Sequence, residues 1–159
     1  MEQVPAYFHV SFAPNIKLVS TVRRFTAEFY ERLLVDADIA ARLALATHEL
    51  LENAVAYAVD GETGVRIELD AHELVIRTWN RTTPEHLAEL TAGIDELNRE
   101  PDADAYYQTL MARTAKRTDG SGLGLARIRA EADMTVSYEL DHDRVCIVAR
   151  TPIKTEQHA

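Results

Sequence analysis

Glu49 and Asn53 are the pair of residues in this 159-residue chain whose types and spacing suit chemistry most directly. They lie four positions apart in a stretch that is typical of a long helix, so both side chains project from one face, about one turn apart. Magnesium accepts an asparagine oxygen together with waters and substrate phosphates, and a carboxylate one turn away can take a proton from an attacking hydroxyl. The alternative is that both are solvated polar residues on an amphipathic helix.

A glycine-rich run, Gly120-Ser121-Gly122-Leu123-Gly124-Leu125, follows about seventy residues later. Glycines let the backbone approach phosphates closely, and a helix that starts there aims its free N–H groups at an anion. The alternative is an ordinary flexible loop, but Leu123 and Leu125 favour phosphate binding because they place the glycines between apolar anchors. The run lacks the last glycine of Gly-x-Gly-x-x-Gly and the Gly-Lys-Ser/Thr ending of a P-loop, which disfavours both motifs.

Other chemical motifs are incomplete. The segment His48-Glu49-Leu50-Leu51-Glu52 has a glutamate where a zinc-protease helix needs its second histidine. The remaining histidines show no paired spacing, and no serine-centred nucleophile elbow occurs. Carboxylates between residues 95 and 104 most simply form a solvated face, or could meet a basic partner.

The apolar pattern along the chain predicts the elements that must position these residues. Strands are expected over 6–12, 65–69, 74–79, 135–140 and 144–150. Helices are expected over 16–34, about 36–59, 84–98, 102–116 and 125–132. In the first helix we expect a buried stripe of Val22, Phe25, Phe29 and Leu33. Two hairpins among segregated helices predict an α+β two-layer sandwich, with a mixed, mostly antiparallel sheet covered on one face by helices.

Composition limits the class of protein. With 159 residues, 47% of them hydrophobic, the chain is expected to form one domain over 1–159, with 155–159 as a frayed tail. The net charge of −9 disfavours nucleic acid or an anionic membrane as a main partner, and favours a basic protein surface. The single cysteine, Cys146, excludes an internal disulfide, and neither a leader pattern nor a membrane span is evident. We therefore expect a cytoplasmic protein.

The segment Glu49-Leu50-Leu51-Glu52-Asn53-Ala54 and the glycine run, in this order and at this separation, resemble two motifs of the GHKL superfamily of gyrase, histidine-kinase and chaperone ATPases. These motifs are the N-box and the second glycine box of the Bergerat fold. Within the superfamily the chain is most similar, over essentially its whole length, to the small serine kinases of bacterial anti-sigma-factor switches. The resemblance implies ATP and magnesium as cofactors, Glu49 as catalytic base and Asn53 as magnesium ligand. It also implies that the triphosphate is held by Gly120, Ser121, Gly122, Leu123 and Gly124.

The segment Asn80-Arg81-Thr82-Thr83-Pro84 departs from the family pattern. The family usually has Asp-x-Gly-x-Gly here, and its aspartate accepts a hydrogen bond from the adenine amino group. Asn80 stands in the aspartate's place and can accept that hydrogen through its amide oxygen, without charge assistance. Thr82 and Pro84 replace the glycines, and the proline stiffens the segment. By the same resemblance, residues 84–119 correspond to a lid over ATP.

The leading hypothesis is an ATP-binding regulatory protein, a serine/threonine kinase that phosphorylates or sequesters a small partner protein. The resemblance implies a partner that is an anti-sigma-factor antagonist or is similar to a sigma factor. The alternative is a catalytically weak or inactive module that acts as a protein-binding switch, docking to a regulator or to a second copy of itself as a homodimer. An orphan histidine-kinase ATPase module is a weaker third hypothesis, because Glu49 is placed as a base.

Overall fold

A computed structural model describes residues 6–114 and 123–153. The strands are β1 (Ala6–Phe12), β2 (Thr63–Leu69), β3 (Glu73–Arg81), β4 (Thr135–Asp141) and β5 (Arg144–Pro152). The helices are α1 (Ile16–Leu33), α2 (Ala37–Tyr57), α3 (Pro84–Arg99), α4 (Ala103–Thr114) and α5 (Leu123–Glu131). None of the helices within these described ranges is long and apolar enough to span a membrane.

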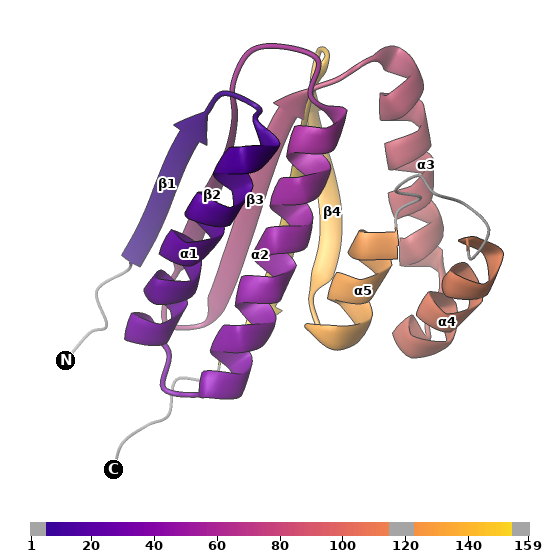
Figure 1. Ribbon diagram of the computed structural model, residues 1–159. Helices are drawn as coiled ribbons and strands as arrows, with labels where there is room; N and C mark the ends of the chain where they lie inside the picture. The colour runs from indigo at the N-terminus through magenta and orange to yellow at the C-terminus, as the bar shows by residue number, and fades with distance from the viewer. Residues whose placement is uncertain (1–5, 115–122, 154–159) are drawn as a thin grey trace.

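The strands form one sheet in the order β1-β2-β3-β5-β4, and every pairing between these strands is antiparallel. Both predicted hairpins are present. The first turns where Asp70 accepts hydrogen bonds from the backbone N–H groups of His72 and Glu73, and the second turns at His142, whose φ is +57°. Helices lie on one face of the sheet (Figure 1), which confirms the α+β two-layer prediction, although no parallel pair occurs among the described strands.

Helix α2 is the central helix of the layer and carries the Glu49 and Asn53 pair (Figure 1). It begins at the cap residue Asp36, whose carboxylate accepts from the backbone N–H groups of Asp38 and Ile39 at 2.9 and 3.2 Å, satisfying donors that have no partner inside the helix. Its apolar face, which includes the fully buried Leu43, Leu50 and Leu51, belongs to the core that the helices share with the sheet. Burial of that face fixes the rotation of α2.

The buried face of α1 differs from the predicted stripe. Val22 is buried as expected, but Phe25 is 58% exposed, and the other buried positions are Val19, Thr26 and Tyr30. The buried hydroxyl of Tyr30 lies 2.6 Å from Thr47 Oγ1 of α2, and Thr47 in turn donates to the Leu43 carbonyl. Burial raises the pKa of Tyr30. Phe29 is only partly buried against the core, and Leu33 is 39% exposed. The buried face therefore includes a hydrogen-bonded tyrosine, which hydrophobic periodicity alone does not predict.

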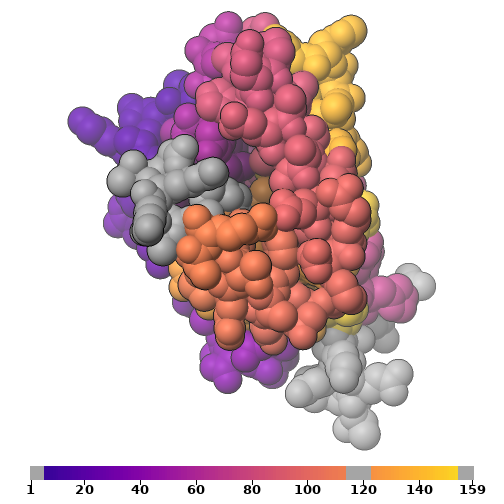
Figure 2. Space-filling model, turned by 90° about the vertical axis from the view of Figure 1, so that its right-hand side faces the viewer, coloured from indigo at the N-terminus to yellow at the C-terminus, as the bar shows by residue number. Residues whose placement is uncertain are grey.

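Helices α3 and α4 occupy most of the segment predicted as a lid, and Figure 2 shows them on the flank of the molecule. They contribute Ile94, Leu97, Tyr106 and Leu110 to the core. Asn98 of α3 donates to the Val136 carbonyl of β4 at 3.0 Å, and the two helices are joined by an ion pair at 2.9 Å. Residues 115–119 lie outside the described residues, and the lid stays a prediction.

Candidate functional site

Glu49 and Gly124, which come from the two sequence motifs, are in contact. An alanine Cβ built at Gly124 would lie 2.6 Å from Glu49 Oε2, well inside van der Waals contact. The Glu49 side chain is only 20% exposed, so its carboxylate is held between α2 and α5. The glycine at position 124 therefore leaves room for the carboxylate in this position, and a larger residue would displace it.

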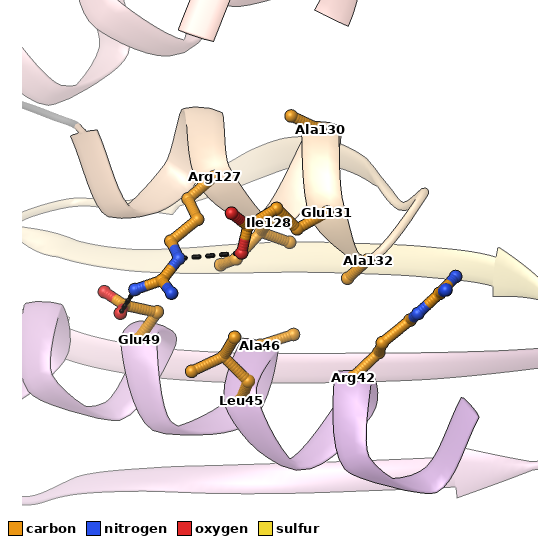
Figure 3. A pocket seen from close by; sticks show the side chains of 9 residues that line it. All are labelled: Arg42, Leu45, Ala46, Glu49, Arg127, Ile128, Ala130, Glu131 and Ala132. Atoms are coloured by element: carbon orange, nitrogen blue, oxygen red, sulfur yellow. Dashed lines mark hydrogen bonds and ion pairs between the residues drawn. The ribbon is translucent and has the colours of Figure 1, made fainter. Parts of the chain in front are cut away.

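Arg127 of α5 lies across the same carboxylate (Figure 3). Its Nη1 is 3.5 Å from Glu49 Oε1, and its Nε donates to Glu131 at 2.8 Å. The pKa of Arg127 is raised, with the hydrogen bond to Glu131 as the largest cause and the charge of Glu49 as a smaller one. The cation thus orients Glu49 against the start of α5, a contact that the sequence motifs do not reveal.

The two helices run in opposite directions. In Figure 3, Arg127 lies beside Glu49, while Ala132 lies at the end of the pocket near Arg42. The start of α5 therefore points toward the Asn53 end of α2, where Asn53 is half-buried one turn beyond Glu49. Leu123 is the first residue of α5. Gly120, Ser121 and Gly122 lie outside the described residues.

Asn80 is the last residue of β3 whose side chain lies on the face of the sheet that the helices cover. It is 3% exposed, and its Nδ2 donates to the Arg81 carbonyl at 3.3 Å, so any hydrogen bond that the side chain accepts is formed by Oδ1. Thr78 and Thr82 lie two residues to either side, and their buried hydroxyls have no hydrogen-bond partner among the described residues. Such groups are costly to bury alone. Their chemistry fits the polar edge of a bound base.

The end of β3 is tied to the chain segments on either side of it. The Val59 N–H, just after α2, donates to the Arg81 carbonyl at 3.1 Å. The Arg81 guanidinium pairs with Asp60 at 2.9 Å and with Asp143 at 2.6 Å. The hydrogen bond from Arg81 lowers the pKa of Asp143, and the hydrogen bond to Asp143 is the largest cause that raises the pKa of Arg81. These contacts hold Asn80 beside the C-terminal end of α2.

The altered glycine box forms a helix start. Thr83 is the cap of α3, and its Oγ1 accepts from the His86 N–H at 3.3 Å, while Pro84 occupies the first helical turn. Proline suits this place because its fixed φ is already helical and its missing N–H is not needed there. The residues that replace the glycines therefore add local order next to Asn80.

Comparison with known families identifies the arrangement. Residues 12–151 match the family model described as a histidine kinase-like ATPase domain. The chain belongs to this family. Membership of the histidine kinase-like ATPase domain family implies nucleotide binding, and it confirms the predicted relation to the GHKL superfamily.

The fold is also found among solved structures. The chain is similar to one in the crystal structure of the SiaB-SiaC complex from Pseudomonas aeruginosa, with a TM-score of 0.64. The sequences are 17% identical, over 91% of this chain and 89% of that chain. No curated protein matches the sequence significantly. At this identity the likeness shows the fold, and it confirms the Bergerat-type α+β class.

Sequence reasoning missed two cations, Arg127 and Arg42, that line the pocket beside Glu49. Arg127 follows Gly124 by three positions, so a helix starting in the glycine run places both on one face. That spacing was the available signal. Arg42 precedes Glu49 by seven positions, two helical turns, which is again the same face of a helix.

Proposed function

We propose that this member of the family is an ATP-dependent serine/threonine protein kinase of the anti-sigma-factor type, acting on a small partner protein in a partner-switching pathway. The observation that carries the proposal is the contact between Glu49 and Gly124, which holds a carboxylate beside the helix that follows the glycine run. Membership of the ATPase domain family supports a nucleotide as the ligand. A chain of the same fold occurs in the SiaB-SiaC complex, which supports a protein partner.

The donor groups of this site fit magnesium-ATP, because Asn53 offers a neutral oxygen one turn from the Glu49 carboxylate. When bound, that group supplies an electrophilic γ-phosphorus and an ADP leaving group. Asn53 would hold the magnesium ion, and Asn80 would accept the adenine amino hydrogen. The free N–H groups at the start of α5 favour the negative phosphates.

Glu49 is the proposed general base. It orients an acceptor hydroxyl and takes its proton while the hydroxyl oxygen bonds to the γ-phosphorus and the bond to the ADP oxygen breaks. Arg127 is a positioning residue, since it contacts the carboxylate and keeps it directed toward the start of α5. The chemistry is therefore mainly positional and electrostatic.

The test compares Glu49→Gln with Glu52→Gln. Glu52 lies on the same helix but is more exposed and pairs with His48 at 3.0 Å, so it is a matched control for the loss of one carboxylate. Transfer of radiolabelled phosphate from ATP to a co-purifying partner should fall by roughly 10²- to 10⁴-fold in Glu49→Gln. The affinity of Glu49→Gln for the nucleotide should stay close to that of wild type. The transfer rate of Glu52→Gln should also stay close to that of wild type. Wild-type rates in Glu49→Gln would refute the mechanism.

A second candidate function is a protein-binding switch that binds nucleotide but transfers little phosphate. The ordered helix start at Thr83 and Pro84 favours it, since this segment is glycine-rich and adaptable where the family pattern is intact. Saturable ATP binding, with no phosphate transfer to any protein that co-purifies with the chain, would favour the switch over the kinase.

A further inference from the structure

A pocket of about 440 Å³ lies between α2 and α5, on the side of Glu49 that faces away from Asn53. Its volume is within the range of small-molecule sites, roughly 300–1,000 Å³. Short side chains, including Ala46, Ala130 and Ala132, contribute to its lining and leave the space open. Figure 3 shows Glu49 at one end and Arg42 at the other.

The order of residues along α2 shows which end of the pocket faces the proposed nucleotide site. Asn80 and the end of β3 lie beside the C-terminal end of α2, followed toward its N-terminus by Asn53, Glu49 and Arg42. On the proposed function, the nucleotide lies along the first part of this row, with its transferable phosphate next to Glu49. The acceptor hydroxyl must reach both Glu49, which takes its proton, and the phosphorus that its oxygen attacks, so it has to approach Glu49 from the side that the nucleotide leaves free. That side is the pocket.

The charges of the pocket indicate what kind of acceptor segment it takes. Arg127 is already paired with both carboxylates of the lining, Glu49 and Glu131. Arg42 is exposed and forms no ion pair with any residue in the described ranges. A cation without a protein partner at the far end of a pocket attracts a carboxylate from a ligand.

We propose, on the basis of the kinase function above, that this pocket binds the acceptor segment of the partner protein and that Arg42 pairs with an acidic residue of that segment. Arg42 precedes Glu49 by seven positions, which is about 10 Å along a helix. An extended peptide advances about 3.3 Å per residue. The acidic residue is therefore about three positions from the serine or threonine that is phosphorylated.

The experiment uses the full chain with magnesium, a non-hydrolysable ATP analogue and short Gly/Ala peptides with one central serine. One pair of peptides carries Asp about three positions before or after the serine, and the matched pair carries Asn. Binding is followed by NMR through the backbone amides of Ala46 and Ala130, which report on opposite walls of the pocket. The Asp peptides should bind roughly two- to fivefold more tightly than the Asn peptides.

Substitutions at Arg42 test whether this residue causes the preference for Asp peptides over Asn peptides. Arg42→Ala should remove it, Arg42→Lys should retain most of it, and Arg42→Glu should prefer a peptide with Lys in place of Asp. Arg23→Ala, at an exposed position of α1, is the matched control and should leave the preference unchanged. Absence of binding, equal affinity for Asp and Asn peptides, or an unchanged preference in Arg42→Ala would overturn the proposal.

Phosphate transfer to the serine, measured separately with ATP, distinguishes failure of this inference from failure of the proposed function. Charge-dependent binding without transfer to any peptide or partner contradicts the kinase and supports the pocket assignment. Transfer at equal rates to Asp and Asn peptides supports the kinase and contradicts the role of Arg42.

Discussion

At the scale of single residues, the contact between Gly124 and Glu49 gives the glycine at position 124 two possible roles. The glycine lies in a run of the type that accommodates phosphates, and its missing side chain also leaves room for a carboxylate from another helix. The group that a built Cβ would meet is the far end of a flexible side chain. An added methyl group should therefore displace the carboxylate without disturbing the helices.

We predict that Gly124→Ala separates stability from activity. Alanine in a helix is favoured over glycine by about 0.5–1 kcal/mol, while loss of the partly exposed Glu49–Arg127 pair costs roughly 0–1 kcal/mol. The free energy of unfolding, measured with urea, should stay within about 1 kcal/mol of wild type. The transfer rate should fall by about tenfold or more because the base is moved.

Gly93→Ala is the control for this substitution. Gly93 lies on the exposed surface of α3, and a Cβ built there has no neighbour within 4 Å in the described structure. It should raise the free energy of unfolding by about 0.5–1 kcal/mol and leave transfer unchanged. A Gly124→Ala protein that retains wild-type transfer would show that the position of Glu49 does not matter to the chemistry.

At the scale of elements, Arg81 at the end of β3 forms ion pairs with two turns. It contacts Asp60 after α2 and Asp143 between β4 and β5, and both pairs are largely exposed. Exposed pairs contribute little individually. Their place matters more than their energy, because they surround the strand end that presents Asn80.

The Arg81–Asp143 pair should give stability a measurable pH dependence. The pKa of Asp143 is lowered in the folded protein, so its contribution is present above the unfolded pKa of about 4 and is lost as the pH falls through the folded value. Urea unfolding of wild type and Asp143→Asn should therefore differ most near neutral pH. The difference should shrink between about pH 5 and pH 3.

Asp141→Asn is the matched control, since Asp141 is highly exposed in the same hairpin and the imidazole nitrogen paired with it, His142 Nε2, is 3.8 Å away. A difference between wild type and Asp143→Asn that stays constant down to acid pH would mean that the pair with Arg81 does not form in solution.

The elements that could be predicted from the sequence were those in which one physical signal dominates. α2 has a cap, an apolar face and a polar face, and the β2–β3 hairpin has two β-rich runs around a turn, so both were located within a few residues. The face of α1 could not be predicted from hydrophobic spacing, because it includes Thr26 and Tyr30, and the partner of the Tyr30 hydroxyl, Thr47, lies on another helix.

The candidate site was predictable to a similar degree. Motif resemblance indicated Glu49, Asn53 and Gly124, and the structure brings Glu49 and Gly124 into contact. It did not indicate Arg127 or Arg42. Helical spacing places Arg127 on the face of Gly124 and Arg42 on the face of Glu49, but only the antiparallel packing of α5 against α2 brings both cations to one pocket. That arrangement is set by tertiary packing, to which local sequence patterns are insensitive.

At the scale of the whole molecule, the two faces of the sheet differ. Helices cover one face, and on the other Trp79 is shielded by His9, stacked at 5.2 Å, and by the Arg144 guanidinium at 5.3 Å. Gly64 lies under this indole, since a Cβ there would be 2.4 Å from the ring. The residues of the proposed function therefore lie on the helical side of the sheet. They follow α2 from the end of β3 to Arg42.

The measurement that tests this account most directly is calorimetric titration of magnesium-ATP into wild type and Asn53→Ala, with GTP as the control for recognition of the base. We predict saturable, magnesium-dependent ATP binding to wild type and weaker binding of GTP. Binding of ATP to Asn53→Ala should be at least tenfold weaker, a loss of about 1.4 kcal/mol or more. Absence of binding heat for any nucleotide with folded wild-type protein at several temperatures, or equal affinities of the two proteins, would contradict these predictions.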